Sequence, residues 1–276
     1  KGRNIMKLFL LLMAFATLAS NCFAQSDEPE KQKVLILYYS QTGVTEKVAK
    51  ELQLKLGADV EKIEITEPYK GNFDETIQRC LKEMKNNELP HLRPIQSDLK
   101  KYDVIFLGFP VWFGTYARPV ITMVKSLKFA GKKIVPFCTF GSGGLVECSA
   151  QLKEALPLAE IKEGFGIREA RIDRTAVEID RFLKLNGYIE GNVERYPEYS
   201  EQKPVNEEEK QIFDAACSNY KFPLGIPVTV GMRQTPKGTD YLFTATGKTP
   251  DGTDTESKIY ITVETGKTPE FTLVVR

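Results

Sequence analysis

Residue types that carry common chemistry are scarce in this sequence. It has a single histidine, His91, which lies among prolines, and its five cysteines include no Cys-x-x-Cys pair. Zinc and most other transition metals are bound by clusters of such residues, so this scarcity argues against a metal site. The fingerprint Gly-x-Gly-x-x-Gly is also missing, so no dedicated dinucleotide site is visible.

The sequence also has no excess of charge of one sign. The 38 Lys and Arg residues nearly balance the 37 Asp and Glu residues, which leaves a formal net charge of +1. Lys1, Arg3 and Lys7 lie in the first 24 residues, where there is no acid, so removing these three leaves about −2. Nucleic-acid-binding proteins present a strong basic surface, so this balance excludes a nucleic acid as partner.

Long hydrophobic runs are limited to the N-terminus. Lys7 precedes an apolar run over residues 8–19, which is too short to span a bilayer comfortably. Cys22 and Ala24 then place small residues at the −3 and −1 positions of a signal-peptidase site. We predict a signal peptide over residues 1–24, a mobile spacer over residues 25–32, and an exported, periplasmic protein with no transmembrane segment in the mature chain.

Two alternatives remain for this N-terminus. The apolar run could stay uncleaved as an anchor, or Cys22 could carry a lipid. Residues 19–21 read Ala-Ser-Asn and lack the leucine usual three residues before a lipidated cysteine, which disfavours the lipid.

Residues 34–56 predict a site for a phosphate. The apolar run over residues 34–39 suits one buried strand, and Val48, Leu52 and Leu56 follow at helical spacing. Between them, hydroxyl groups surround a glycine at a helix N-terminus, where backbone N–H groups and the helix dipole favour an anion. No Lys or Arg lies inside the loop over residues 40–45, unlike in a P-loop, so these neutral donors suit the single phosphate of a mononucleotide. Residues 40–45, which we call loop 1, are the predicted cofactor-binding residues Ser40, Gln41, Thr42, Gly43, Val44 and Thr45.

Strand and helix patterns then alternate as far as residue 187. Further strands are predicted over residues 60–65, 103–108, 133–138 and 161–167. Helices are predicted over residues 74–85, with Ile77, Cys80, Leu81 and Met84 on the apolar face, and over residues 117–127, 147–155 and 175–185. This βα alternation implies a doubly wound parallel sheet of five strands, whose ligands bind beyond the carboxyl ends of the strands.

Two more loops follow predicted strands, and both are uncharged. Loop 2 consists of Pro110, Val111, Trp112, Phe113 and Gly114, and loop 3 consists of Thr139, Phe140, Gly141, Ser142, Gly143 and Gly144. A single tryptophan is often only a core or interface anchor, and loop 1 alone is a weak motif. Together, the three loops offer a phosphate cradle, an aromatic platform and a wall of backbone hydrogen-bonding groups, which suit a planar, phosphorylated heterocycle.

Residues 33–187 resemble the flavodoxin family, in particular a bacterial flavodoxin-like branch. The match is carried by Tyr-Ser-Gln-Thr-Gly-Val-Thr at 39–45, by Phe-Pro-Val-Trp-Phe-Gly-Thr at 109–115, and by the glycines of loop 3. The resemblance implies FMN as cofactor, with its phosphate in loop 1 and its isoalloxazine between loops 2 and 3. It also implies that Trp112 stacks on the ring, and that Pro110 and Gly114 shape a loop whose peptide group faces the flavin N5.

The resemblance implies electron transfer to or from a redox partner protein or a small electron acceptor. Loops 2 and 3 contain no Asp or Glu, so we expect less repulsion of the reduced flavin than in strongly acidic carriers, and a less extreme low potential. The chain could be an electron carrier, a reductase of small acceptors such as quinones, or a flavodoxin-fold binding module without redox activity. Arg118 could steer an acceptor, or it could pair at a helix start.

The cysteines leave a question about redox state. Cys138 and Cys148 flank loop 3 and could form a disulfide in an exported protein. Cys80 and Cys138 lie on apolar elements, so they could equally be buried free cysteines.

The region after residue 187 does not correspond to any part of a flavodoxin. We predict a linker over residues 188–205 and a small α+β domain of unknown role over residues 206–276. Asn206 and Glu209 have the spacing of a capping box before a helix over residues 207–220. Four antiparallel strands are predicted from residue 227 to the end. A sheet that only extends the first domain is the alternative.

Overall fold

The computed structural model describes residues 32–70, 73–249 and 252–276. The predicted signal peptide and all but the last residue of the spacer lie outside these described residues. Residues Lys33–Arg276 form one compact unit. Within the described ranges, no helix has the length and apolar character that crossing a bilayer would require.

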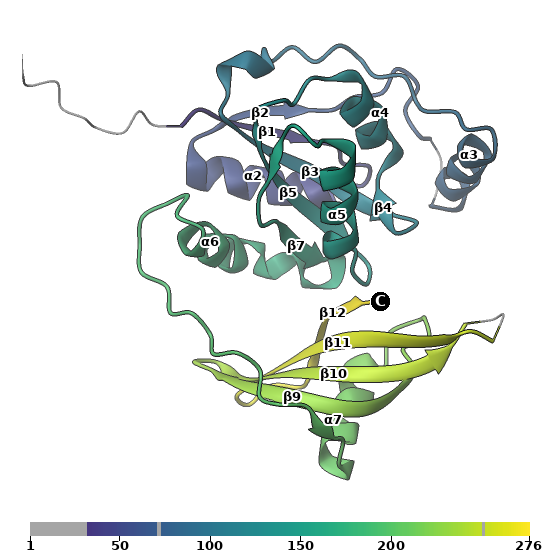
Figure 1. Cartoon of the computed structure of the whole chain (residues 1–276), viewed down its shortest axis with the longest axis vertical. Helices are drawn as coiled ribbons and strands as arrows, with labels where there is room; N and C mark the ends of the chain where they lie inside the picture. The colour runs from purple at the N-terminus through teal and green to yellow at the C-terminus, as the bar shows by residue number, and fades with distance from the viewer. Residues whose placement is uncertain (1–31, 71–72, 250–251) are drawn as a thin grey trace, which may run out of the picture. The chain divides into compact units, whose positions relative to one another are not determined.

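Strands and helices alternate in the first part of this unit, as Figure 1 shows. In chain order they are β1 (Val34–Tyr38), α2 (Val44–Leu56), β2 (Asp59–Lys62), α3 (Phe73–Lys85), the 3₁₀ helix η1 (Leu99–Lys101), β3 (Val104–Trp112), β4 (Thr115–Tyr116), α4 (Arg118–Ser126), β5 (Lys133–Phe140), α5 (Leu145–Ala155), β6 (Glu160–Ile161), β7 (Phe165–Arg168), the 3₁₀ helix η2 (Glu169–Arg174) and α6 (Thr175–Leu185). We call this part the α/β module.

The main sheet of the α/β module is parallel, in the order β2-β1-β3-β5-β6. The predicted doubly wound sheet of five strands is therefore confirmed. The strand expected over residues 161–167 is divided in two, because β6 and β7 pair with opposite ends of β5 and residues between them leave the ladder. β4 forms an antiparallel hairpin with the end of β3.

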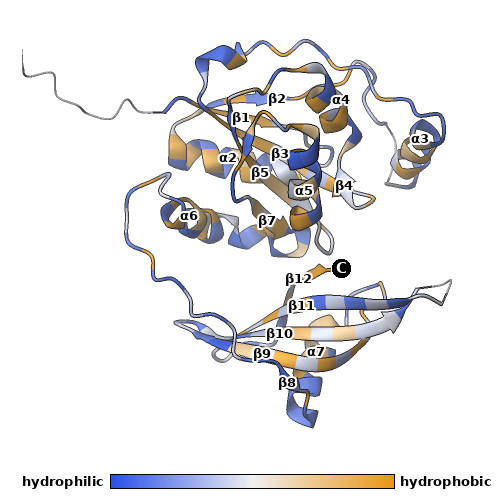
Figure 2. Cartoon of the chain, in the orientation of Figure 1, coloured by the Kyte–Doolittle hydropathy of each residue, from blue (hydrophilic) through white to orange (hydrophobic). Residues whose placement is uncertain are grey.

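Helices cover both faces of this sheet, and each face has its own core. Side chains of β1 alternate between the two cores, with Leu35 and Leu37 on one face and Ile36 on the other. Helices α4 and α5 pack on the first face, whereas α2 and α6 pack on the second. In Figure 2, α2 and α6 carry both colours, as expected of helices with one buried side. Central strands buried on both faces explain the continuous apolar runs in the sequence.

Helix α3 corrects one expectation. Of the four residues predicted on its apolar face, Cys80 is buried, but Leu81 and Met84 are 42% and 46% exposed. Over residues 74–85, where burial is described, the other buried residue is a carboxylate, Glu83. The helix therefore turns a charged group inward, where the Tyr69 hydroxyl and Arg118 bind it.

The C-terminal part is an antiparallel sheet with one helix, which we call the C-terminal module. Its elements are β8 (Lys203–Pro204), α7 (Glu207–Cys217), β9 (Ile226–Thr235), β10 (Gly238–Lys248), β11 (Asp254–Glu264) and β12 (Glu270–Val275), with the sheet order β12-β11-β10-β9-β8. The capping box of Asn206 and Glu209 is present as predicted. β8 adds a short fifth strand from within the segment predicted as linker. Phe213 of α7 packs on Phe243 in the third core, so this module has its own hydrophobic centre.

Candidate functional site

The three predicted loops meet at one edge of the parallel sheet. They follow β1, β3 and β5, which are neighbours in the sheet, so their carboxyl ends lie together (Figure 1). The hydroxyls of Thr45 and Thr139 are 2.7 Å apart and join loop 1 to loop 3. The rings of Tyr39 and Trp112, 5.8 Å between centroids, join the start of loop 1 to loop 2.

Loops 2 and 3 are also in direct contact. A Cβ added to Gly144 would lie 2.7 Å from a methyl carbon of Val111, so the absence of a side chain allows this approach. All three loops are therefore brought together, as the parallel sheet predicted.

Loop 1 leaves backbone amides available at a helix N-terminus. Gly43 is the N-cap of α2, has φ of 88°, and offers no capping side chain. The Ser40 hydroxyl instead accepts hydrogen bonds from the Gly43 amide at 3.1 Å and the Glu46 amide at 3.2 Å. The amide of Val44, the first helical residue, has no carbonyl in a preceding helical turn to bond. The positive end of the helix dipole therefore lies at an uncharged loop.

Two side chains of loop 1 are already engaged within the protein. The Thr45 side chain is buried against Thr139, and the Gln41 amide bridges the Tyr39 hydroxyl at 2.5 Å and the Tyr69 carbonyl at 3.1 Å. Their side chains therefore shape the loop.

Loop 2 is the tip of a two-residue hairpin. Val111 pairs with Tyr116 and Trp112 with Thr115, so Phe113 and Gly114 are the turn. Their φ angles are 51° and 75°, and two positive values in succession are typical of a type I′ turn. A phenylalanine rarely adopts this conformation, yet Phe113 is 51% exposed and gains little burial there. Strain of this kind clusters at functional sites.

Two tyrosine rings stand nearly perpendicular to the Trp112 ring. The Tyr69 ring meets it at 5.4 Å and 86°, and the Tyr39 ring at 5.8 Å and 88°. These edge contacts orient the indole plane. Tyr69 follows a predicted strand in a loop without any recognisable motif, so no sequence signal marks its role.

Tyr69 contacts a compact charged cluster. The Tyr69 hydroxyl donates to Glu83 at 2.8 Å, and Glu83 also pairs with Arg79 at 2.9 Å and Arg118 at 3.0 Å. Arg79 lies over the Tyr69 ring at 4.2 Å. Burial and the hydrogen bond to Glu83 raise the pKa of the Tyr69 hydroxyl. Arg118 is thus paired at its helix start, the second of the two roles considered for it, and the cluster carries one carboxylate and two guanidinium groups.

Loop 3 is held by residues far away in the sequence. The Gly141 carbonyl accepts a hydrogen bond from Arg168 Nε at 2.9 Å, and the Ser142 carbonyl accepts one from the Val274 amide at 3.0 Å. A Cβ added to Gly143 would lie 2.0 Å from the Val274 carbonyl oxygen, so the strand β12 backbone touches this glycine. A Cβ at Gly141 would meet nothing within 4 Å, so that side of the loop is open.

The cysteines near loop 3 are free thiols. Cys138 lies in β5 and Cys148 in α5, and both are fully buried. Burial, followed by the charge of Glu147, raises the pKa of the Cys148 thiol to about 12. Both are therefore protonated core residues at neutral pH.

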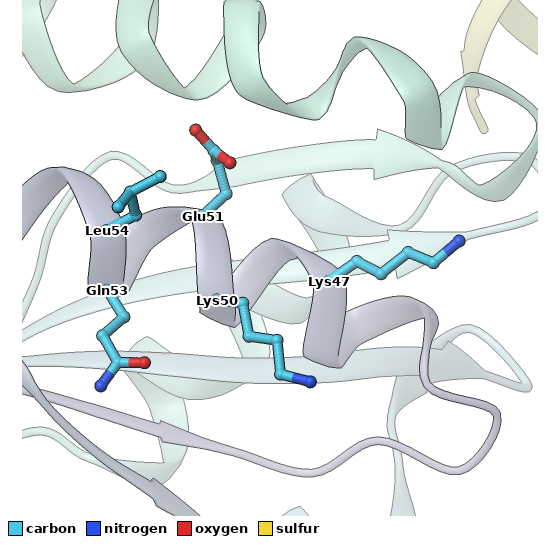
Figure 3. Close-up of a pocket in the computed structure, with 5 residues that line it drawn as sticks. All are labelled: Lys47, Lys50, Glu51, Gln53 and Leu54. Atoms are coloured by element: carbon cyan, nitrogen blue, oxygen red, sulfur yellow. The ribbon is translucent and has the colours of Figure 1, made fainter.

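One surface hollow lies elsewhere, along α2. Its lining residues are Lys47, Lys50, Glu51, Gln53 and Leu54, and Figure 3 shows that their side chains point in different directions. All of them belong to one helix, so no groups from other elements converge there. The described residues also include no cluster of three or more His, Cys, Asp or Glu with metal-binding geometry.

Comparisons with known proteins match the α/β module. The profile of a family described as flavodoxin matches residues 33–179. A structure assigned as a flavoprotein from Bacteroides eggerthii is 27% identical, covering 56% of this chain and 97% of its own, with a TM-score of 0.47. Another from Bacteroides uniformis is 26% identical, covering 55% and 99%, with a TM-score of 0.49. A flavoprotein from Lactobacillus acidophilus in complex with FMN is 23% identical, covering 52% and 99%, with a TM-score of 0.45. No curated protein matches the chain.

Proposed function

This chain belongs to the flavodoxin family, and we propose that it is an FMN-binding redox protein that transfers electrons at the cell envelope. The observation that carries the proposal is the meeting of three uncharged loops at the carboxyl ends of β1, β3 and β5. A ligand held there would meet amide donors at one end and an oriented indole at the other.

The residues present fit FMN. The N-terminus of α2, with Gly43 as N-cap and no capping side chain, suits a phosphate dianion without any need for a basic side chain. Trp112, fixed by Tyr39 and Tyr69, offers an aromatic face for the ring. The space beside Gly141 is open, so loop 3 can approach the flavin ring closely there. FMN, when bound, supplies reversible electron transfer, and the protein orients it and sets its electrostatic surroundings.

The charge around the site supports a potential that is not extremely low. Loops 2 and 3 have no carboxylates, and the nearby cluster of Glu83, Arg79 and Arg118 contains more positive than negative groups. Positive charge near a flavin favours its reduced, anionic form. We therefore expect a midpoint potential higher than that of a flavodoxin with acidic ring loops.

Export is a separate part of the proposal. It is supported by the N-terminal run over residues 8–19 and the small residues before Gln25. Expression with fractionation, followed by N-terminal sequencing, tests it: a periplasmic product that begins at Gln25 supports cleavage, whereas a lipid on Cys22 or a cytoplasmic product contradicts it.

The direct test of FMN binding is an absorbance titration of the purified chain. We expect added FMN to bind with quenched fluorescence, and dithionite to bleach the bound flavin reversibly. Failure to quench FMN fluorescence would remove the redox function and leave a binding module. Within the redox function, reduction by NAD(P)H alone would favour the reductase, and reduction only through a partner protein would favour the carrier.

A further inference from the structure

The C-terminal module contacts the α/β module at loop 3, and this contact suggests a role for it. β12 is an edge strand of the antiparallel sheet, and edge strands carry unpaired backbone groups. The Val274 amide of this edge donates to the Ser142 carbonyl at 3.0 Å, and the Val274 carbonyl lies against Gly143. Loop 3 is thus in contact with the edge of a sheet formed about 130 residues later.

Arg168 bridges the loop and the strand. Its Nε donates to the Gly141 carbonyl at 2.9 Å, and its Nη1 donates to the Phe271 carbonyl at 2.6 Å. The guanidinium also lies over the Phe271 ring at 4.2 Å. The planar, multiply donating group of arginine suits this double contact, which the single ammonium of a lysine cannot reproduce.

Two more arginines follow Arg168, which is the last residue of β7. The 3₁₀ helix η2 has three residues per turn, so Arg171 and Arg174 project from one side of it. Arg171 pairs with Glu178 at 2.8 Å and with Glu270 at 3.1 Å. Arg174 pairs with Glu264 at 2.7 Å and with Glu270 at 3.1 Å. Glu270, the first residue of β12, therefore binds two arginines.

These pairs are partly withdrawn from water. The Arg171 side chain is only 10% exposed and that of Glu264 only 13%. Ion pairs that are shielded and shared in a network contribute more than isolated surface pairs. The network fixes the position of β12 along loop 3, whose residues 141–144 are glycine and serine and have little side chain to pack.

We propose that the C-terminal module holds loop 3 in its flavin-binding conformation, and that Arg168 is the positioning residue of this clamp. The proposal rests on the proposed function for its ligand. In this view the extra module is part of the flavin site, since it fixes the outer side of the loop while the inner side remains free for the ring.

The test compares Arg168→Met with a matched control, Arg93→Met, in the full chain. Arg93 is paired only with Glu64 at 3.7 Å, and its side chain is 60% exposed. Dissociation constants for FMN and for riboflavin, which lacks the phosphate, are measured by fluorescence quenching. Because Arg168 acts on the ring-side loop, we expect its loss to weaken both ligands by the same factor, about tenfold. We expect the control to leave both unchanged.

A second readout does not need the flavin. In the flavin-free chain, hydrogen exchange at the amides of residues 141–144 should accelerate in Arg168→Met and stay unchanged in Arg93→Met. The visible absorption bands of bound flavin should also shift in Arg168→Met, which a loss of global stability alone would not cause. If Arg168→Met fails to fold, Glu270→Gln weakens two arginine pairs at the same contact and should accelerate the same amides.

The outcomes separate the clamp from the proposed function. A folded Arg168→Met or Glu270→Gln chain with unchanged loop exchange overturns the clamp, whether or not flavin binds. Accelerated exchange with unchanged affinity for both flavins overturns its role in flavin binding. A wild-type chain that binds neither flavin overturns the proposed function together with that role, while the exchange data still decide whether the module holds the loop.

Discussion

Loops 1 and 3 lie at the same edge of the sheet, yet they are held in opposite ways. Loop 1 is held by its own neighbours in sequence, since the Ser40 hydroxyl accepts hydrogen bonds from amides three and six residues later. Loop 3 is held by Arg168 and by Val274, which lies 132 residues after Ser142. A loop closed by local bonds forms whenever its strand and helix form. A loop closed by remote bonds depends on the docking of a second module.

The ligand loops of the α/β module and its contact with the C-terminal module also differ in charge. The loops of the α/β module that we assign to the ligand are uncharged, whereas its contact with the C-terminal module is made by arginine and glutamate. Charge thus contributes to the contact between the two modules, where charge complementarity specifies register. Changes at four residues test this contrast.

Gly143→Ala should have the largest effect. Its Cβ would lie 2.0 Å from the Val274 carbonyl oxygen, so loop 3 and β12 must separate. Overpacking of this kind costs about 1–3 kcal/mol in the free energy of unfolding. The matched control is Gly141→Ala, whose Cβ meets nothing within 4 Å and which should change stability by less than about 0.5 kcal/mol. Urea unfolding measures both, and equal losses for the two variants would contradict the contact.

Ser40→Ala breaks the local hold on loop 1. It removes the acceptor of the Gly43 and Glu46 amides, which resembles the loss of a helix cap and costs about 1 kcal/mol of stability. We expect FMN affinity to fall and riboflavin affinity to stay constant, because loop 1 is assigned to the phosphate. Fluorescence titration with the two flavins provides the comparison. A parallel loss for both would show that loop 1 also serves the ring.

Phe113→Asn should stabilise the hairpin of loop 2. It replaces a residue at φ of 51° with one that tolerates this region and creates the Asn-Gly pair preferred in type I′ turns. The gain should be about 1 kcal/mol, seen as a higher Tm. Phe222→Asn, at a site that is 65% exposed and has ordinary φ, is the control and should bring no gain. Weaker flavin affinity in the stabilised variant would show that the strained phenylalanine serves the site.

The smallest effect is expected from pH. Burial, followed by the charge of Glu46, raises the pKa of Tyr38 at the end of β1 from 10.0 to about 12. Because the folded-state pKa lies above the unfolded value, the stabilisation is fully present below pH 10 and is lost as pH rises towards 12. Tm measured between pH 9 and 12 should fall less in Tyr38→Phe than in the wild type. Identical alkaline profiles would contradict a buried, protonated Tyr38.

Much of the α/β module was predictable, because its information is local. Apolar runs, helical spacing and loop composition placed the strands and helices around the three loops within a few residues, and the capping spacing of Asn206 and Glu209 placed the start of α7. These patterns reflect interactions among residues close in the chain, and the rule for parallel sheets then brings the loops to one edge. The inward carboxylate of α3 was not predictable, because Glu83 is buried by partners on Tyr69 and Arg118.

The clamp on loop 3 was decided only by the tertiary structure. The three-residue spacing of Arg168, Arg171 and Arg174 is visible in the sequence, but its meaning depends on a 3₁₀ helix that sets Arg171 and Arg174 on one side and on a strand that arrives about 100 residues later. The residues of loops 1 to 3 follow from strand ends and their chemistry. The backbone contact between Ser142 and Val274 leaves no signature in side-chain types, because every residue except proline offers the same amide and carbonyl.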